Sequence, residues 1–308
     1  MKLIVVIPCY NEELVIKKTA NVISCILEHI KDDGKITEYE IVFVDDGSSD
    51  KTWKFIEEFN STTIRGLKLS RNVGHQGALW AGYEYAQDKC DMVISIDADL
   101  QQDPDAMTFM VDKFLEGYDV IYGVRKNRLT DNFFKRISSS CFYKIIHFLD
   151  GNILPNHADF RLLSNRACKL LVSYPERNIF IRGLVRTLGF KECIVYFDVK
   201  ERAYGESKYS ISKMLNLAID GITSFSVRPL RMITVLGVLI MITAFITAIY
   251  VFVSYVGGKG VPGWSSLLLS IWFLGGIQIF VLGIIGEYIG KIYKEVKHRP
   301  IYCIEKII

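Results

Sequence analysis

Short apolar runs alternate with amphipathic stretches through the first part of the chain. The apolar runs predict strands at Leu3–Ile7, Glu40–Val44, Gly66–Leu69, Met92–Ile96 and Val120–Gly123. The stretches between them have helical spacing and predict helices at Glu12–His29, Lys51–Phe59, Gly77–Gln87 and Pro104–Leu115. Continuous apolar strands that alternate with helices indicate an α/β fold, in which helices cover both faces of a mostly parallel sheet.

The C-terminal part contains two long segments without charge, Ile233–Val256 and Ser265–Gly286, separated by a glycine-rich linker. The first has 24 residues, which at about 1.5 Å each reach roughly 36 Å, enough to cross a bilayer. We therefore expect two transmembrane helices within residues 230–290, joined by a short external loop. A pair of helices buried in a protein core is the alternative interpretation.

Basic residues flank the two apolar segments unevenly. Arg228 and Arg231 precede the first segment, Lys259 lies between the two, and the second is followed by Lys291, Lys294, Lys297 and Arg299. The positive-inside rule then puts both flanks in the cytoplasm. We expect a multi-pass protein of the inner (cytoplasmic) membrane, with the globular region 1–206, the tail 291–308 and both termini in the cytoplasm.

Residues 207–229 connect the globular region to the first apolar segment. Their apolar positions, among them Ile211, Leu215 and Ile219, follow helical spacing, while Lys208 and Lys213 lie on the polar side. Such a stretch predicts amphipathic helix in the membrane interface. A helix packed on the globular core is the alternative, and the pattern leaves both open.

Composition narrows the class of protein. The chain has 308 residues, 50% hydrophobic and 23% charged, with a mean hydropathy of +0.22 and a net charge of +3. A disordered chain is excluded, and the near-neutral charge gives no reason to expect a nucleic acid partner. The seven cysteines are scattered without a C-x-x-C pair, so neither a zinc site nor a disulfide framework is indicated, and a reducing compartment is favoured.

Polar and acidic residues follow three of the predicted strands. Pro8–Glu12 ends the first strand, Asp45-Asp46 the second, and Asp97-x-Asp99 the fourth. Parallel strands present their carboxyl ends at one edge of a sheet, where ligands of α/β proteins bind. One acidic strand end is commonly a helix cap. Three acidic strand ends that converge at one edge of the sheet predict a bound cation or a hydrogen-bonding ligand.

The Asp97-x-Asp99 pair adds a specific chemistry. In extended backbone, residues i and i+2 share a face, and paired carboxylates suit hard cations such as Mg²⁺ or Mn²⁺. The sequence has no P-loop and no G-x-G-x-x-G after the first strand, so it indicates neither an NTPase nor a dinucleotide oxidoreductase. His75 has no second His or Cys at ligand spacing.

Several segments together resemble a known family. They are PCYNEE at 8–13, VDDGSSD at 44–50, LSRNVGHQGA at 69–78 and DADLQQDP at 97–104. The chain resembles the family 2 glycosyltransferases with a GT-A fold, and more narrowly the polyprenyl-phosphate glycosyltransferases, the group of dolichol-phosphate mannose synthase and bacterial bactoprenol glucosyltransferases. The likeness continues through Ala158–Leu163, Arg182–Leu184, Arg202 with Gly205–Ser210, and the two apolar segments. The Q-x-x-R-W motif of processive synthases is missing.

The resemblance implies a reaction. A single hexose is transferred, with inversion, from a nucleotide sugar to polyprenyl (undecaprenyl) phosphate at the cytoplasmic membrane face, for glycosylation of the cell envelope. Glucose from UDP-glucose is the favoured donor, and UDP-GlcNAc or GDP-mannose are alternatives. The resemblance also implies a divalent metal, Mg²⁺ or Mn²⁺, and a homo-oligomer. A non-catalytic nucleotide-sugar-binding membrane scaffold is the hypothesis from another class.

Residue roles follow from the same resemblance. The metal ligands would be Asp97, Asp99 and Gln101. The nucleotide sugar would contact Pro8, Tyr10, Asn11, Glu12, Asp45, Asp46, Asp97, Ala98 and Lys208. The acceptor phosphate would be bound by Arg125, Arg136 and Ser140, with Arg128 and Lys135 as rivals.

The catalytic residues implied are Asp159, Asp99 and Arg202, the last in a loop that closes over the diphosphate together with Lys208. Asp159 would be either a sugar-hydroxyl anchor or a modest base. Outside such a site, Asp159 could instead cap a helix or pair with Arg161.

Overall fold

The computed structural model describes residues 1–59, 61–126, 157–177, 179–198, 228–257 and 263–308. Four of the predicted site residues, Arg136, Ser140, Arg202 and Lys208, lie outside these ranges. So do almost all of the predicted interfacial segment 207–229 and the rivals Arg128 and Lys135. Their predicted roles stay predictions.

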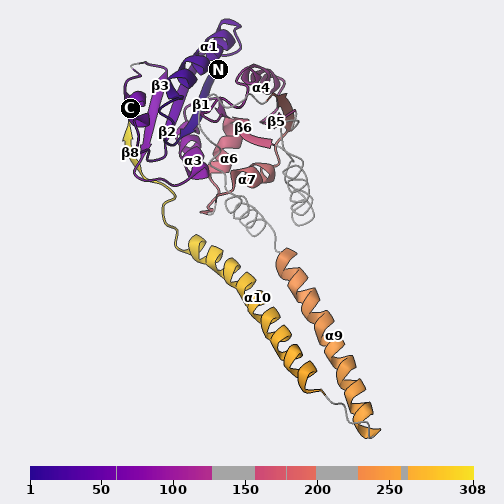
Figure 1. Ribbon diagram of the computed structural model, residues 1–308. Coiled ribbons are helices and arrows are strands. Elements are labelled where there is room, and N and C mark those ends of the chain that lie inside the picture. Colours follow the sequence, from indigo (N-terminus) through magenta and orange to yellow (C-terminus); the bar gives the residue numbers. More distant parts are fainter. Residues whose placement is uncertain (60, 127–156, 178, 199–227, 258–262) are drawn as a thin grey trace. The chain divides into compact units, whose positions relative to one another are not determined.

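The described residues form a mixed sheet of eight strands, in the order β7-β5-β6-β4-β1-β2-β3-β8 (Figure 1). Parallel pairs join β1 to β2 and β4, β2 to β3, and β5 to β7. Strand β6 is antiparallel to both β4 and β5, and β8 is antiparallel to β3. The prediction of a mostly parallel sheet is confirmed. The strands are β1 (Lys2–Cys9), β2 (Glu38–Asp45), β3 (Ile64–Leu69), β4 (Met92–Ser95), β5 (Val120–Arg125), β6 (His157–Ser164), β7 (Glu192–Phe197) and β8 (Ile304–Ile307).

Helices cover both faces of this sheet. On one face, α1 (Ile16–Asp32) buries Ile16, Ile23 and Leu27 in the same cluster as alternate residues of β1. On the other face, Gly82 of α3 (His75–Ala86) approaches the side chain of Val6 so closely that a Cβ atom would lie 2.2 Å from it. The remaining helices of this part are α2 (Thr52–Glu57), α4 (Ala106–Leu115), α6 (Asn165–Val172) and α7 (Ile181–Thr187).

Two long helices follow, α9 (Arg228–Val256) and α10 (Trp264–Val296). Within the described residues one stretch, Phe273–Val296, is long and apolar enough to cross a membrane, whereas the apolar stretch Met232–Thr247 of α9 is shorter. Helix α10 continues beyond the uncharged segment, which ends at Gly286, and beyond the predicted limit at residue 290, through charged residues to Val296. Two membrane-spanning helices therefore remain a prediction.

The C-terminal residues Arg299–Ile308 belong to the same compact unit as the sheet. Strand β8 pairs with β3 at the edge of the sheet, and the backbone of Ile308 exchanges two hydrogen bonds with that of Gly66. Figure 1 shows β8 beside β3. The predicted tail, 291–308, thus contains a strand that the sequence pattern alone did not indicate.

Candidate active site

The carboxyl ends of β1, β2 and β4 meet at one edge of the sheet. The register pairs Cys9 with Asp45, and the Asp46 amide donates to the Cys9 carbonyl at 2.9 Å. Beyond the strands, the Asn11 amide donates to Ser48 Oγ at 3.0 Å and Asn11 Oδ1 accepts from the Ser49 amide at 2.9 Å. The loops after β1 and β2 are therefore locked together, as the parallel topology predicts.

The loop after β2 holds two buried carboxylates. Asp45 Oδ1 accepts from the Ser48 amide at 3.3 Å, while Asp45 Oδ2 is buried and has no hydrogen-bond partner among the described residues. Asp46 accepts from the amides of Val73 and Gly74 at 2.7 and 3.0 Å. Burial raises the pKa of both carboxyls above the ordinary value. Asp45 thus offers an acceptor that a ligand donor can satisfy.

The Asp97-x-Asp99 pair adopts a different backbone from the extended one expected. Strand β4 ends at Ser95, and residues 98–99 lie in a turn. Gln102 holds Asp97 on two sides, because its Oε1 accepts from the Asp97 amide at 3.1 Å and its Nε2 donates to Asp97 Oδ2 at 2.6 Å. Asp99 Oδ1 accepts from the Gln101 amide at 3.1 Å. The turn, not strand alternation, orients these carboxylates.

The predicted metal ligands can be tested against this geometry. Within the described residues, no group of three or more His, Cys, Asp and Glu side chains is arranged to hold a metal ion. Mg²⁺ is commonly bound through one or two carboxylates together with substrate phosphates. Asp97, Asp99 and the side-chain carbonyl oxygen of Gln101 fit such a shared shell, since each carboxylate oxygen has two acceptor positions.

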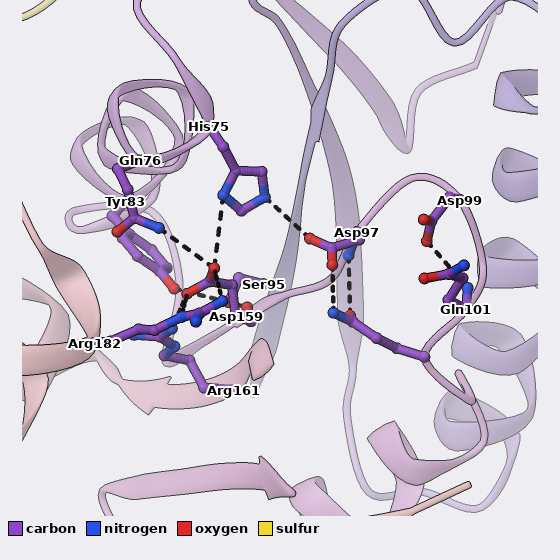
Figure 2. A network of polar contacts seen from close by, with 11 residues as sticks. His75, Gln76, Tyr83, Ser95, Asp97, Asp99, Gln101, Asp159, Arg161 and Arg182 are labelled. Carbon is purple, nitrogen blue, oxygen red and sulfur yellow. Dashed lines mark hydrogen bonds and ion pairs between the residues drawn. The ribbon is translucent and has the colours of Figure 1, made fainter. Parts of the chain in front are cut away.

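A second cluster surrounds Asp159 on β6, which is 5% exposed (Figure 2). The guanidinium of Arg182 donates to both carboxylate oxygens, Nε to Oδ1 at 3.1 Å and Nη2 to Oδ2 at 2.8 Å. The fully buried Arg161 donates to Oδ1 at 2.5 Å, and Gln76 Nε2 donates to Oδ2 at 3.3 Å. Ser95 Oγ donates to the Asp159 carbonyl at 2.6 Å, which joins the cluster to the end of β4.

These partners decide the charge of Asp159. Burial alone would raise its pKa, but the charges of Arg182, Arg161 and His75 outweigh burial and hold the pKa well below the ordinary range. A general base needs a pKa near the working pH and an oxygen within reach of the proton it removes. A carboxylate already held by two guanidinium groups is better suited to anchor hydrogen-bond donors than to take up a proton.

His75 connects the two carboxylates. It is the first residue of α3, and its Nε2 lies 3.0 Å from Asp97 Oδ1 while its Nδ1 lies 3.7 Å from Asp159 Oδ2 (Figure 2). Partial burial would lower the pKa of His75, but the hydrogen bond with Asp97 and the negative charges of Asp97 and Asp159 raise it. This contact of His75 was not predicted from the sequence, in which His75 has no second His or Cys at ligand spacing; the LSRNVGHQGA segment was the available signal.

The other predicted residues lie at the same edge or near it. Pro8 is buried in β1, Tyr10 is 41% exposed, and the Glu12 amide donates to Thr52 Oγ1 at 2.8 Å. The buried Ala98 accepts from Thr19 Oγ1 at 2.6 Å through its carbonyl. Arg125 is the last residue of β5 and pairs in the ladder with Phe197. Arg182 was part of the family likeness, but no role had been predicted for it, and its contact with Asp159 makes it a further functional candidate beside His75.

Comparison with known proteins places the chain in a family. The model of Glycosyl transferase family 2 matches residues 4–171, and a model described as GtrB C-terminal hairpin matches residues 228–292. The uncharacterized glycosyltransferase YkoT of Bacillus subtilis is 46% identical over 306 residues, which are 98% of this chain and 91% of that protein. The SfII prophage-derived bactoprenol glucosyl transferase of Shigella flexneri is 37% identical over 310 residues, which are 99% of this chain and 98% of that protein.

Among solved structures, the glucosyl-3-phosphoglycerate synthase of Mycobacterium tuberculosis, in complex with Mn²⁺, UDP-glucose and phosphoglyceric acid, aligns with a TM-score of 0.49. The two are 17% identical, and the alignment covers 72% of this chain and 77% of that one.

The chain belongs to glycosyl transferase family 2, and it is a glycosyltransferase. The family match confirms the resemblance that the motifs at the strand ends predicted, and it extends to the C-terminal hairpin. The mixed, mostly parallel sheet is the GT-A-like fold expected for such an enzyme. The strand-end carboxylates lie at the sheet edge where α/β proteins bind their ligands.

Proposed function

We propose that the enzyme transfers one hexose, glucose from UDP-glucose, to polyprenyl phosphate at the cytoplasmic face of the membrane, with inversion at the anomeric carbon. The observation that carries the proposal is the connection of Asp97 to Asp159 through His75, which joins the strand-end carboxylates to a strongly cationic cluster. Full-length relatives named bactoprenol glucosyl transferase support a polyprenyl acceptor.

The nucleotide would bind over the ends of β1 and β2. The unpartnered Asp45 Oδ2 is a buried acceptor for an N–H or O–H group of the base or ribose. Asp46, Asn11 and Glu12 support the same loops, and the exposed ring of Tyr10 is available for contact with the base. A divalent cation held by Asp97, Asp99 and Gln101, Mg²⁺ or Mn²⁺, would stabilise the negative charge of the departing diphosphate.

The acceptor sets the acid–base requirement. In the transfer, an oxygen of the acceptor phosphate forms a bond to the anomeric carbon, and the bond to the nucleoside diphosphate breaks with its electron pair. A phosphomonoester has a second pKa of about 6, so its oxygen is already anionic near neutral pH. No strong base is needed, which agrees with the low pKa of Asp159. We assign Asp159 to anchoring sugar hydroxyls and to orienting Arg182.

The remaining roles rest on the family resemblance. Arg125, with Arg136 and Ser140, would bind the acceptor phosphate, and Arg202 with Lys208 would close over the diphosphate. The membrane would hold the polyprenyl tail, and the apolar stretch Phe273–Val296 of α10 is long enough to anchor the enzyme there. The relatives named for bactoprenol, a membrane lipid carrier, agree with membrane association.

The test is transfer from a panel of radiolabelled nucleotide sugars to undecaprenyl phosphate, with the purified full chain in detergent. The expected result is lipid-linked label from UDP-glucose that EDTA abolishes and Mg²⁺ or Mn²⁺ restores. Asp99→Ala should abolish this transfer, while Asp105→Ala, which alters an exposed carboxylate of the same segment, should retain it. If label is transferred only from UDP-GlcNAc or only from GDP-mannose, that nucleotide sugar, and not UDP-glucose, is the donor. Binding without transfer from any donor would favour the scaffold hypothesis instead.

A further inference from the structure

The N-terminus of α3 is held by hydrogen bonds from several sides. The Gly74 amide, directly before the helix, donates to Asp46 Oδ2 at 3.0 Å. Gln76 donates to Asp159 through Nε2 and accepts from the amide of Ile181, the first residue of α7, at 3.0 Å through Oε1. His75, between these two residues, is therefore held where the ends of β2, β4 and β6 come together.

The imidazole of His75 lies between two carboxylates that have different predicted tasks. Asp97 belongs to the proposed metal and diphosphate site, and Asp159 belongs to the cluster with Arg161 and Arg182. The opposite oxygen of Asp97 is already held by Gln102 Nε2 at 2.6 Å. Contacts from Gln102 and His75 thus fix both oxygens of Asp97 and define the rotation of its carboxylate.

Core packing does not explain this contact. The side chain of His75 is 40% exposed, so it contributes little to the buried core, whereas the Asp159 side chain is 6% exposed. A half-exposed imidazole that lies between two carboxylates, at an edge where substrates bind, is placed to orient a ligand-binding group. Since the proposed metal would be held by Asp97, the orientation of that carboxylate matters for affinity.

We propose that His75 is a positioning residue of the transfer reaction. Through Nε2 it holds the Asp97 carboxylate in the orientation that receives the cation and the donor diphosphate, and through Nδ1 it sets the separation from the Asp159 cluster. The donor site and the sugar site then have a fixed geometry relative to each other. This inference rests on the proposed function for the identity of the substrates, but not for the contact itself.

Two substitutions by amide side chains test the contacts of the two ring nitrogens of His75 separately. In His75→Gln the side-chain amide can take the place of Nε2 and keep the contact with Asp97. In His75→Asn the shorter amide can take the place of Nδ1, so the contact with Asp97 is lost. His75→Ala removes both contacts, and His29→Ala, an exposed histidine on α1, is the matched control.

The experiment measures binding as well as turnover. Mn²⁺ binding in the presence of UDP is followed by electron paramagnetic resonance, and glucosyl transfer is followed with undecaprenyl phosphate. Loss of a group that orients a metal ligand weakens metal affinity or activity about 10- to 100-fold. His75→Ala and His75→Asn should show such a loss in Mn²⁺ affinity, His75→Gln should recover most of it, and His29→Ala should match the parent. Thermal unfolding of all four should agree closely.

Three outcomes would overturn the assignment. They are Mn²⁺ affinity unchanged in His75→Ala, recovery by His75→Asn and not by His75→Gln, or a loss that follows the unfolding temperature and not the contact. Failure of the proposed function is distinguishable. If the parent binds Mn²⁺ and UDP but transfers no sugar to the lipid, the ranking of the variants in Mn²⁺ affinity still tests His75.

Discussion

The hydroxyl of Tyr302 donates a hydrogen bond of 2.6 Å to the carboxylate of Glu84 on α3. The two residues are 218 positions apart, and the contact ties the C-terminal segment to the helix that begins with His75. Ile301 supports the same attachment, because its side chain approaches within 3.7 Å of the point where a Cβ atom of Gly77 would lie. The chain that leaves α10 therefore returns to the helix that bears the site.

Tyr302→Phe tests this attachment. It removes one hydrogen bond to a charged partner at a half-exposed position, so we expect a loss of about 0.5–1 kcal/mol in the free energy of unfolding. For a domain of this size that corresponds to a drop of about 2 °C in Tm. Differential scanning fluorimetry in detergent measures it, with Tyr196→Phe on the exposed edge strand β7 as the control. Equal Tm values for parent and Tyr302→Phe would mean that strand pairing alone holds the tail.

The local pattern of apolar and polar residues was sufficient to predict the strands and helices in the first part of the fold. β1 to β5 and α1 to α4 all appear within a few residues of their predicted ranges. The reason is local: β1, for example, is a continuous apolar run, and α1 buries one apolar face. Strand β8 could not be found in this way. Its four residues, Ile304–Ile307, have two adjacent charges between two isoleucines and so no alternation, and their partner on β3 lies more than 230 positions earlier in the chain.

The same distinction between local pattern and tertiary contact applies to the candidate site. Parallel topology correctly predicts that Asp45, Asp46 and Asp97 lie at the carboxyl ends of β2 and β4, the two strands that flank β1. Strand β6 lies between β4 and β5 and is antiparallel to both, and this pairing brings Asp159 beside the end of β4. The position of β6 depends on tertiary contacts, so the local sequence pattern does not predict it. The contacts of Asp159 with His75 and Arg182 depend on that position, so the sequence could indicate the residues but not their arrangement.

Substitutions at two glycines allow the cost of backbone strain to be measured apart from the cost of steric overlap. Gly34 and Gly47 both have a left-handed backbone, with φ of 71° and 68°. A Cβ atom on Gly34 would meet nothing within 4 Å, but on Gly47 it would lie 2.8 Å from backbone atoms of Arg71 and Asn72. Gly34→Ala should therefore cost about 1–2 kcal/mol from strain alone. Gly47→Ala should cost about 1–3 kcal/mol more from overpacking.

The position of Gly47 adds a functional readout to this comparison. The loop after β2 would shift away from Arg71 and Asn72, and this would strain the hydrogen bonds of Asp46 with the amides of Val73 and Gly74. The KM for the donor should therefore rise in Gly47→Ala and stay unchanged in Gly34→Ala. Chemical denaturation and donor titration measure the two effects. Equal stabilities of the two variants would show that the loop can move without cost.

Asp119, buried before β5, predicts a specific dependence of stability on pH. Hydrogen bonds from Arg166 and Ser164 lower its pKa in the folded protein. Such a group stabilises the fold above its unfolded pKa of about 3.9, and the stabilisation is lost as the pH falls through the lower, folded pKa. Asp119→Asn should therefore be less stable than the parent by about 1 kcal/mol at pH 7, and the difference should shrink below about pH 4.

The control for Asp119 is Asp88→Asn, whose carboxylate forms an exposed ion pair with Lys169. Exposed pairs contribute little to stability, so this variant should follow the parent at every pH. Urea unfolding at a series of pH values gives both curves. A difference between Asp119→Asn and the parent that stays constant down to pH 3 would mean that the shape of the side chain, and not its charge, matters.

The low pKa of Asp159 predicts the pH profile of the reaction. Because Arg182 and Arg161 hold this carboxyl ionised, it should not titrate between pH 5 and 8. The parent should lose kcat/KM on the acid side near pH 6, where the acceptor phosphate gains its proton. Asp159→Asn should lower kcat strongly, since it weakens the contact with Arg182, but the remaining activity should keep the same acid limb. An acid limb that disappears in Asp159→Asn would identify Asp159 as the general base and contradict its assignment as an anchor.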